Sequence, residues 1–96
     1  MADDNSIFIG NKPFMNYVTS VVVQFTTKGA KEVVIKARGK FISRAVDVAE
    51  VAMKRFLKDR IGLKGIRIDS EGFHSSETGH DVRVSTIEII LEKKSS

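Results

Sequence analysis

The sequence predicts an α/β fold, a two-layer βαβαββ sandwich in which two helices cover a four-stranded mixed sheet and a C-terminal β-hairpin arm projects from it. Two segments repeat apolar residues at the helical spacing of three and four, and several others alternate apolar and polar residues as strands do. A chain of 96 residues with 42% hydrophobic content can form one core but not two. We expect a single domain over residues 6–93, between a disordered N-terminus at 1–5 and a tail at 94–96.

The first half of the chain alternates strand and helix. The apolar pattern of residues 6–10 predicts a short strand that ends at Gly10. Pro13 fits the first position of a helix, because the N–H that proline lacks would be unpaired there. Apolar residues then recur at helical spacing to about Lys28, and Gly29 is expected to end the helix. The next strand is expected around residues 33–36.

A second amphipathic helix is expected to follow the glycine of segment 36–47 and to end near Lys58. Its core face is predicted to consist of Ile42, Ala45, Val46, Ala49, Met53, Phe56 and Leu57. An apolar shoulder lies beside this face and consists of Phe41, Val48, Val51 and Ala52. A monomer would leave the shoulder partly exposed to water, so we expect it to form a subunit interface.

The last third of the chain changes to the period of two that is typical of a β-hairpin. Apolar and polar residues alternate around Ile66 and again from Val82, on either side of a polar turn at 75–80. The apolar positions switch from even to odd near 85–86, which requires either a bulge or an outer half that leaves the globular body. We expect a projecting arm, because residues 70–81 are too polar to cover a core.

Positive charge is concentrated in one part of the chain. The net charge is +4, yet residues 12–44 contain seven basic side chains and one acidic side chain, whereas residues 45–96 contain nine of each. The isoelectric point of about 9.6 would be weak support by itself. A segregated excess of positive charge is typical of proteins that bind nucleic acids.

The turns that lead into the two helices are expected to meet at one edge of the sheet. A strand–helix–strand connection is right-handed and the first two strands are expected to run parallel, so residues 11–13 and 38–40 should be neighbours. Glycines let backbone N–H groups approach a ligand closely, and helix starts favour phosphate. We therefore expect phosphate contacts from Lys12, Arg38, Lys40 and Arg44, assisted by Asn11 and by the backbone at Gly10 and Gly39.

The hairpin adds weaker candidates. Arg83 is predicted either to reach a phosphate or to neutralise Asp69 or Glu71 across the hairpin. Phe73 is predicted to pack against its own hairpin in preference to wedging at a base step.

Several kinds of site are not expected. His74, Glu77 and His80 are spaced three apart, but a polar hairpin tip offers no surrounding side chains to orient metal ligands. The chain contains no cysteine, which excludes disulfides and thiolate chemistry. No apolar stretch is long enough to span a membrane, and no secretory signal is evident, so we expect a cytoplasmic location.

Three stretches of the chain, residues 9–18, 35–47 and 83–89, resemble the Alba family of archaeal chromatin proteins. The resemblance extends over about residues 6–93 in the right order and spacing. It implies a homodimer that coats and compacts double-stranded DNA without strong sequence preference, forms higher assemblies on DNA and also binds RNA. It further implies that the hairpin arms enter the minor groove and that Phe56 contacts a neighbouring dimer.

The first loop departs from the family pattern. Members of the family usually carry two adjacent lysines there, and the first is the acetylated one. This chain has Asn11 at that position, which leaves Lys12 as the possible modification site.

The sequence thus predicts a chromosome-associated nucleic-acid-binding protein without enzymatic activity, cofactor or metal. One alternative is a ribonucleoprotein subunit whose main partner is structured RNA. Another is a small phosphate-ester hydrolase, which could also use an arginine beside a glycine turn. Its only candidates for a nucleophile or base in these loops are Ser43 and Asn11, and neither is convincing.

Overall fold

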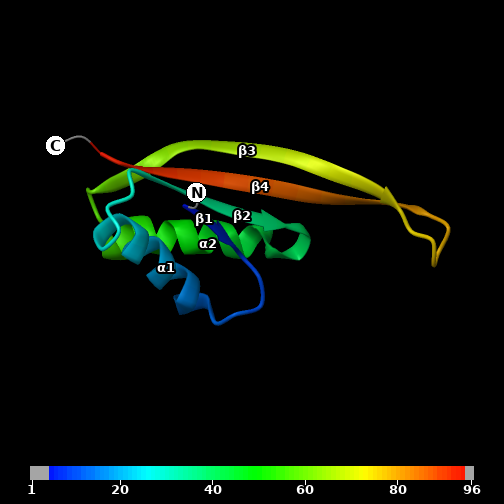
Figure 1. Cartoon of the computed structure of the whole chain (residues 1–96), viewed down its shortest axis with the longest axis horizontal. Helices are drawn as coiled ribbons and strands as arrows, with labels where there is room; N and C mark the ends of the chain where they lie inside the picture. Colours follow the sequence, from blue (N-terminus) through cyan, green and yellow to red (C-terminus); the bar gives the residue numbers. More distant parts are fainter. Residues whose placement is uncertain (1–4, 95–96) are drawn as a thin grey trace.

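The structure is a computed structural model that describes residues 5–94 (Figure 1). Residues 1–4 of the expected N-terminal tail and residues 95–96 of the C-terminal tail lie outside this range. The elements are β1 (Ser6–Phe8), α1 (Phe14–Thr26), β2 (Glu32–Arg38), the 3-10 turn η1 (Gly39–Phe41), α2 (Ile42–Val51), the π-helical turn η2 (Ala52–Phe56), β3 (Ile61–His74) and β4 (Asp81–Lys93). The predicted βαβαββ order is confirmed.

The four strands form one mixed sheet in the order β1-β2-β4-β3. β1 and β2 run parallel, whereas β4 pairs antiparallel with both β2 and β3. Both helices lie on one face of the sheet and leave the other face open (Figure 1). α1 contacts β1 and β2, and α2 contacts β2 and β4, so β3 forms the edge next to α2. The predicted two-layer arrangement is therefore confirmed.

The core lies between the helices and the covered face of the sheet. Its largest fully buried side chains are Ile35, Leu57, Leu91, Val18, Val21, Val33 and Val48. α1 begins one residue later than predicted, because Pro13 has an extended backbone and occupies the N-cap position. Among residues 5–94, no helix combines the length and apolar character that crossing a membrane would require.

The core face predicted for α2 is partly wrong. Val48 and Ala52 are fully buried, so these two shoulder residues belong to the core of this chain and offer no surface to a partner. Val46, a predicted core residue, is 42% exposed. Small alanine side chains at three buried positions let α2 approach its neighbours closely, and this draws Val48 into the core. The shoulder residues Phe41 and Val51 are half-buried against that core.

The π-helical turn explains why Phe56 departs from the predicted face. The N–H of Leu57 donates to the carbonyl of Ala52 at 2.9 Å, five residues back, which widens the last turn of the helix. Leu57 consequently enters the core, whereas Phe56 is 50% exposed. A helical wheel of constant pitch does not anticipate this change.

The hairpin forms the projecting arm that the sequence predicts. β3 and β4 pair from Ile61 opposite Lys93 to His74 opposite Asp81, and the arm extends well beyond both helices (Figure 1). It gives the molecule a long axis of 53 Å against 24 and 23 Å. The single irregularity in the β3–β4 pairing lies between Leu63 and Gly65, and pairing continues through 85–86. Of the two explanations for the switch in apolar positions, the projecting arm is correct.

Candidate nucleic-acid interface

The loop between β1 and α1 is fastened by one tyrosine hydroxyl. Gly10 and Lys12 both donate their backbone N–H groups to the Tyr17 hydroxyl oxygen, each at 2.9 Å. Tyr17 is buried on the first turn of α1, and a buried tyrosine hydroxyl usually finds a polar partner. Since the N–H of Gly10 is already engaged, the expectation that it assists a ligand is wrong. The role of Tyr17 was missed because its spacing identifies it only as a core residue.

The turn between β2 and α2 requires its glycine. Gly39 has a φ of +57°, a conformation that other residues rarely adopt. Neither this helical segment nor α1 has a side-chain cap or an acidic residue in its first turn. Both helix starts therefore present N–H groups that no side chain of residues 5–94 caps, and such groups attract anions.

Arg44 joins the two loops. Its Nη2 atom donates to the backbone carbonyl of Lys12 at 2.9 Å, and its guanidinium lies over the ring of Phe14 at 5.8 Å. The Nε atom of Arg44 is buried and has no hydrogen-bond partner among residues 5–94. The loops at 11–13 and 38–40 are thus neighbours, as the topology predicts.

A groove of about 340 Å³ opens where the loops meet, and we call it the loop groove. The residues that line it are Gly10, Asn11, Phe14, Lys40, Phe41, Ser43, Arg44 and Asp47. The ammonium of Lys40 lies 5.4 Å from the centre of the Phe41 ring. Of the predicted site residues, the structure therefore brings Asn11, Lys40 and Arg44 together, with Lys12 exposed next to Asn11 on the same loop.

Arg38 does not share this groove, although it precedes Gly39 in the chain. As the last residue of β2 it points to the open face of the sheet, where its Nη2 atom lies 3.0 Å from the Glu71 carboxylate. Strand alternation is the reason, because the preceding residue, Ala37, faces the core.

Arg83 lies on the arm, on the face that continues the helix-covered side. It is the cross-strand partner of Gly72, and its Nη1 atom would be 2.9 Å from a Cβ at that glycine. Asp69 and Glu71 lie on the opposite face of the hairpin by strand alternation. The prediction that Arg83 neutralises one of them is therefore wrong. Phe73 lies opposite Val82 and keeps half of its surface exposed.

Cations on the open face of the sheet are paired. Lys36 and Arg67 both reach Glu88, at 3.8 and 3.6 Å. Lys64 donates a hydrogen bond to the Glu32 carboxylate, and this bond raises the pKa of Lys64 above its ordinary value. By contrast, the ion pairs among residues 5–94 include none from Lys12, Lys40 or Arg44. The loop groove therefore has positive charge that no ion pair among residues 5–94 offsets.

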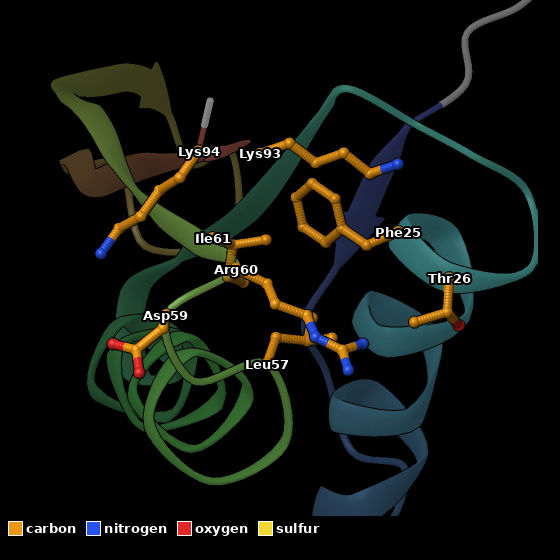
Figure 2. Close-up of a pocket in the computed structure, with 8 residues that line it drawn as sticks. All are labelled: Phe25, Thr26, Leu57, Asp59, Arg60, Ile61, Lys93 and Lys94. Atoms are coloured by element: carbon orange, nitrogen blue, oxygen red, sulfur yellow. The ribbon is translucent and has the colours of Figure 1, made fainter. Parts of the chain in front are cut away.

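A second hollow, of about 430 Å³, lies at the opposite ends of the two helices (Figure 2). Its apolar side chains are Phe25, Leu57 and Ile61, and Arg60, Lys93 and Lys94 bring cations to it (Figure 2). Cations are favourable near the C-terminal end of a helix. None of the predicted site residues lines this hollow.

The comparisons with known proteins agree with this architecture. The Alba family model matches residues 5–70. The DNA/RNA-binding protein Alba of Methanocella arvoryzae is 55% identical over 93 residues, which is 97% of this chain and 94% of the relative. The DNA/RNA-binding protein Alba 1 of Archaeoglobus fulgidus is 58% identical over 91 residues, which is 95% of this chain and 98% of the relative.

Two solved structures resemble this fold. Alba from Thermoplasma volcanium superimposes with a TM-score of 0.79 at 46% identity, covering 91% of this chain and 98% of its own. ALBA1 from Trypanosoma brucei gives a TM-score of 0.73 at 24% identity, covering 97% of this chain and 72% of its own, and so supports the fold alone. On the family match and on relatives of this identity and coverage, the chain belongs to the Alba family.

Proposed function

We propose that the protein binds nucleic acids without sequence specificity, coating and compacting double-stranded DNA on the chromosome and also binding RNA. The loop groove carries this proposal, because two uncapped helix starts meet there beside cations that form no ion pair within residues 5–94. The relatives from M. arvoryzae and A. fulgidus bear the name DNA/RNA-binding protein, which supports the same class of ligand.

The chemistry of the groove suits the phosphate backbone. Lys40 and Arg44 supply positive charge, with Lys12 exposed beside the groove. Asn11 supplies an amide, and the helix starts supply N–H groups. Phosphate contacts position a protein on a duplex but carry no information about the bases. A protein that binds mainly through this groove is therefore expected to tolerate any sequence.

The arm extends this contact along the ligand. It leaves the body beside the β2–α2 turn, where Val84 lies 3.7 Å from the position of a Cβ on Gly39. Arg83 and Phe73 are exposed farther along it. A narrow two-stranded arm with these side chains is suited to entering the minor groove next to phosphates held at the loop groove.

We also propose that the protein is a homodimer whose interface differs from the predicted shoulder. Leu63, Ile66 and Ile68 pair with the core-facing residues of β4, so they lie on the helix side of the sheet, yet all three are exposed. Met53 lines a hollow together with the first residues of β3, which directs this flank of α2 toward the same edge. The interface that we propose includes the exposed or half-buried apolar side chains of this edge and of the helix beside it, namely Ile42, Val46, Met53, Leu63, Ile66 and Ile68. Phe56 lies outside it and remains the candidate for contacts between dimers.

Fluorescence anisotropy with random duplex DNA and random RNA at several salt concentrations tests the proposal. A dimer that neutralises about six phosphates should give a plot of log K against log salt with a slope of about −5. Unrelated duplexes should bind within a few-fold of one another, and competition will rank DNA against RNA. Affinity that is indifferent to salt, or strong preference for one sequence, would contradict this function.

A further inference from the structure

The ion pair between Arg38 and Glu71 is unusual in its position. Arg38 ends β2 directly before the turn at Gly39, whereas Glu71 belongs to β3, two strands away in the sheet. The guanidinium nitrogen and the carboxylate oxygen are 3.0 Å apart, and both side chains are 58% exposed. The pair therefore crosses over β4 and connects the body of the protein to the arm.

The register makes the choice of partner informative. Arg38 lies opposite Thr86, and Thr86 lies opposite Asp69, so Asp69 is the acidic residue in line with Arg38. Glu71 is opposite Val84, one step farther toward the tip of the arm. The Asp69 carboxylate instead accepts the backbone N–H of Ser70 at 2.8 Å. Arg38 is thus directed along the arm, and within the described part of the chain its ion-pair partner is Glu71.

A carboxylate on a guanidinium occupies the same fork of N–H donors that a phosphate uses. An exposed ion pair of this kind contributes only about 0–1 kcal/mol, so a polyanion can displace the carboxylate readily. Arg38 also stands immediately before the uncapped helix start at Gly39, on the route from the loop groove to the arm.

We propose that Glu71 determines affinity by standing in for a backbone phosphate: it holds Arg38 in the free protein, and nucleic acid displaces it. This inference rests on the proposed function. In the bound state Arg38 contacts a phosphate, and the released Glu71 carboxylate lies close to the ligand and opposes it. Glu71 therefore lowers the affinity for every nucleic acid and lowers the number of net phosphate contacts.

The substitution Glu71→Gln tests this directly, because it removes the charge and keeps the size of the side chain. Asp69→Asn is the matched control, since it removes one negative charge from the same face of the same strand without releasing Arg38. We expect Glu71→Gln to bind random duplex DNA about threefold to fivefold more tightly than Asp69→Asn, the range that corresponds to an exposed pair. The salt slope should steepen by up to about 0.9 per subunit. Glu71→Ala should behave like Glu71→Gln.

The same substitutions in an Arg38→Ala protein test whether Glu71 acts through Arg38. There, Glu71→Gln should change affinity no more than Asp69→Asn does, because no guanidinium remains to be released. Equal affinities of Glu71→Gln and Asp69→Asn in the otherwise unchanged protein would overturn the inference and leave the proposed function intact. Weaker binding by Glu71→Gln would also overturn it, since the pair would then serve to hold the arm in its binding position. Failure of the unsubstituted protein to bind would refute the proposed function itself, and the inference with it.

Discussion

Replacing Tyr17 by Phe removes a single oxygen atom and should loosen the first loop of the interface. That oxygen accepts the N–H groups of Gly10 and Lys12, each at 2.9 Å, and Tyr17 is 6% exposed. A hydrogen bond of this type contributes about 0.5–1.5 kcal/mol to stability, so the loss of two should lower the free energy of unfolding by about 2 kcal/mol. For a domain of this size the melting temperature should fall by about 8–16 °C.

The same substitution should weaken binding without changing its electrostatics. A loop that is free in the unbound protein must be ordered on the ligand, and ordering a residue costs about 1–2 kcal/mol of backbone entropy. Partial loss of order over residues 10–12 should therefore reduce affinity by roughly tenfold, which corresponds to about 1.4 kcal/mol. No charge is removed, so the salt slope should be unchanged.

Circular dichroism melting and anisotropy titrations at three salt concentrations measure both effects. Ser20→Ala is the control, because the Ser20 hydroxyl donates only to the carbonyl of Asn16 within α1, at 2.9 Å and exposed to water. It should leave melting temperature and affinity nearly unchanged. If Tyr17→Phe had the same melting temperature as the unsubstituted protein, or if its salt slope became shallower, the hydroxyl would not organise the loop in this way.

Three further predictions concern the groove, the interface and the arm. Arg44→Ala should lower both stability and affinity, because Arg44 holds the first loop through the carbonyl of Lys12. Lys40→Ala should lower affinity alone and reduce the salt slope by about 0.9 per subunit. If Arg44→Ala melted at the same temperature as Lys40→Ala, Arg44 would not hold the loop. Ile66→Asp should convert a dimer into 10.7 kDa monomers in light scattering, and an unsubstituted protein that is already monomeric at micromolar concentration would rule out the interface. Replacing residues 74–80 with an Asn-Gly turn should weaken duplex binding more than single-strand binding, because a single strand offers no groove; equal affinities before and after would exclude groove entry.

The order of the elements could be predicted because each depends on a local pattern. Gly29 follows the end of α1 and Gly39 precedes α2, and both have a positive φ, as the glycine positions in the sequence predict. The meeting of the two loops follows from the parallel pairing of β1 and β2, because both strands then end at the same edge of the sheet. These features require no knowledge of how individual side chains are oriented.

The orientation of α2 could not be predicted because apolar residues occupy more than half of its circumference. Several phases of a helical wheel then bury similar amounts of apolar surface, and tertiary packing selects among them. The π-helical turn at residues 52–56 adds a change of phase that nothing in the sequence signals. Val48 is therefore buried although the sequence predicts it beside the core face, and Phe56 is half-exposed although the sequence predicts it on that face.

The Arg38–Glu71 pair was likewise beyond prediction, because it depends on the register of the hairpin. The irregularity between Leu63 and Gly65 shifts the rest of β3 by one residue against β4. A shift of one residue moves every side chain of a strand to the opposite face. Without this irregularity Glu71 would lie on the helix side of the sheet, out of reach of Arg38, and the sequence does not mark its position.

The pairing of charges determines how a chain with a net charge of only +4 can orient a polyanion. On the open face of the sheet, Glu88, Glu71 and Glu32 offset nearby cations at contact distance, so little field from these pairs extends beyond the Debye length of about 8 Å at physiological salt. Among the described residues that line the loop groove, Asp47 is the acidic one beside Lys40 and Arg44, and the helix starts add positive potential. Of these two surfaces, the loop edge should therefore attract a duplex more strongly. Contact with the arm then brings phosphates to the one paired arginine that lies on that path, which is why Glu71, and not Glu88 or Glu32, is the carboxylate expected to limit affinity.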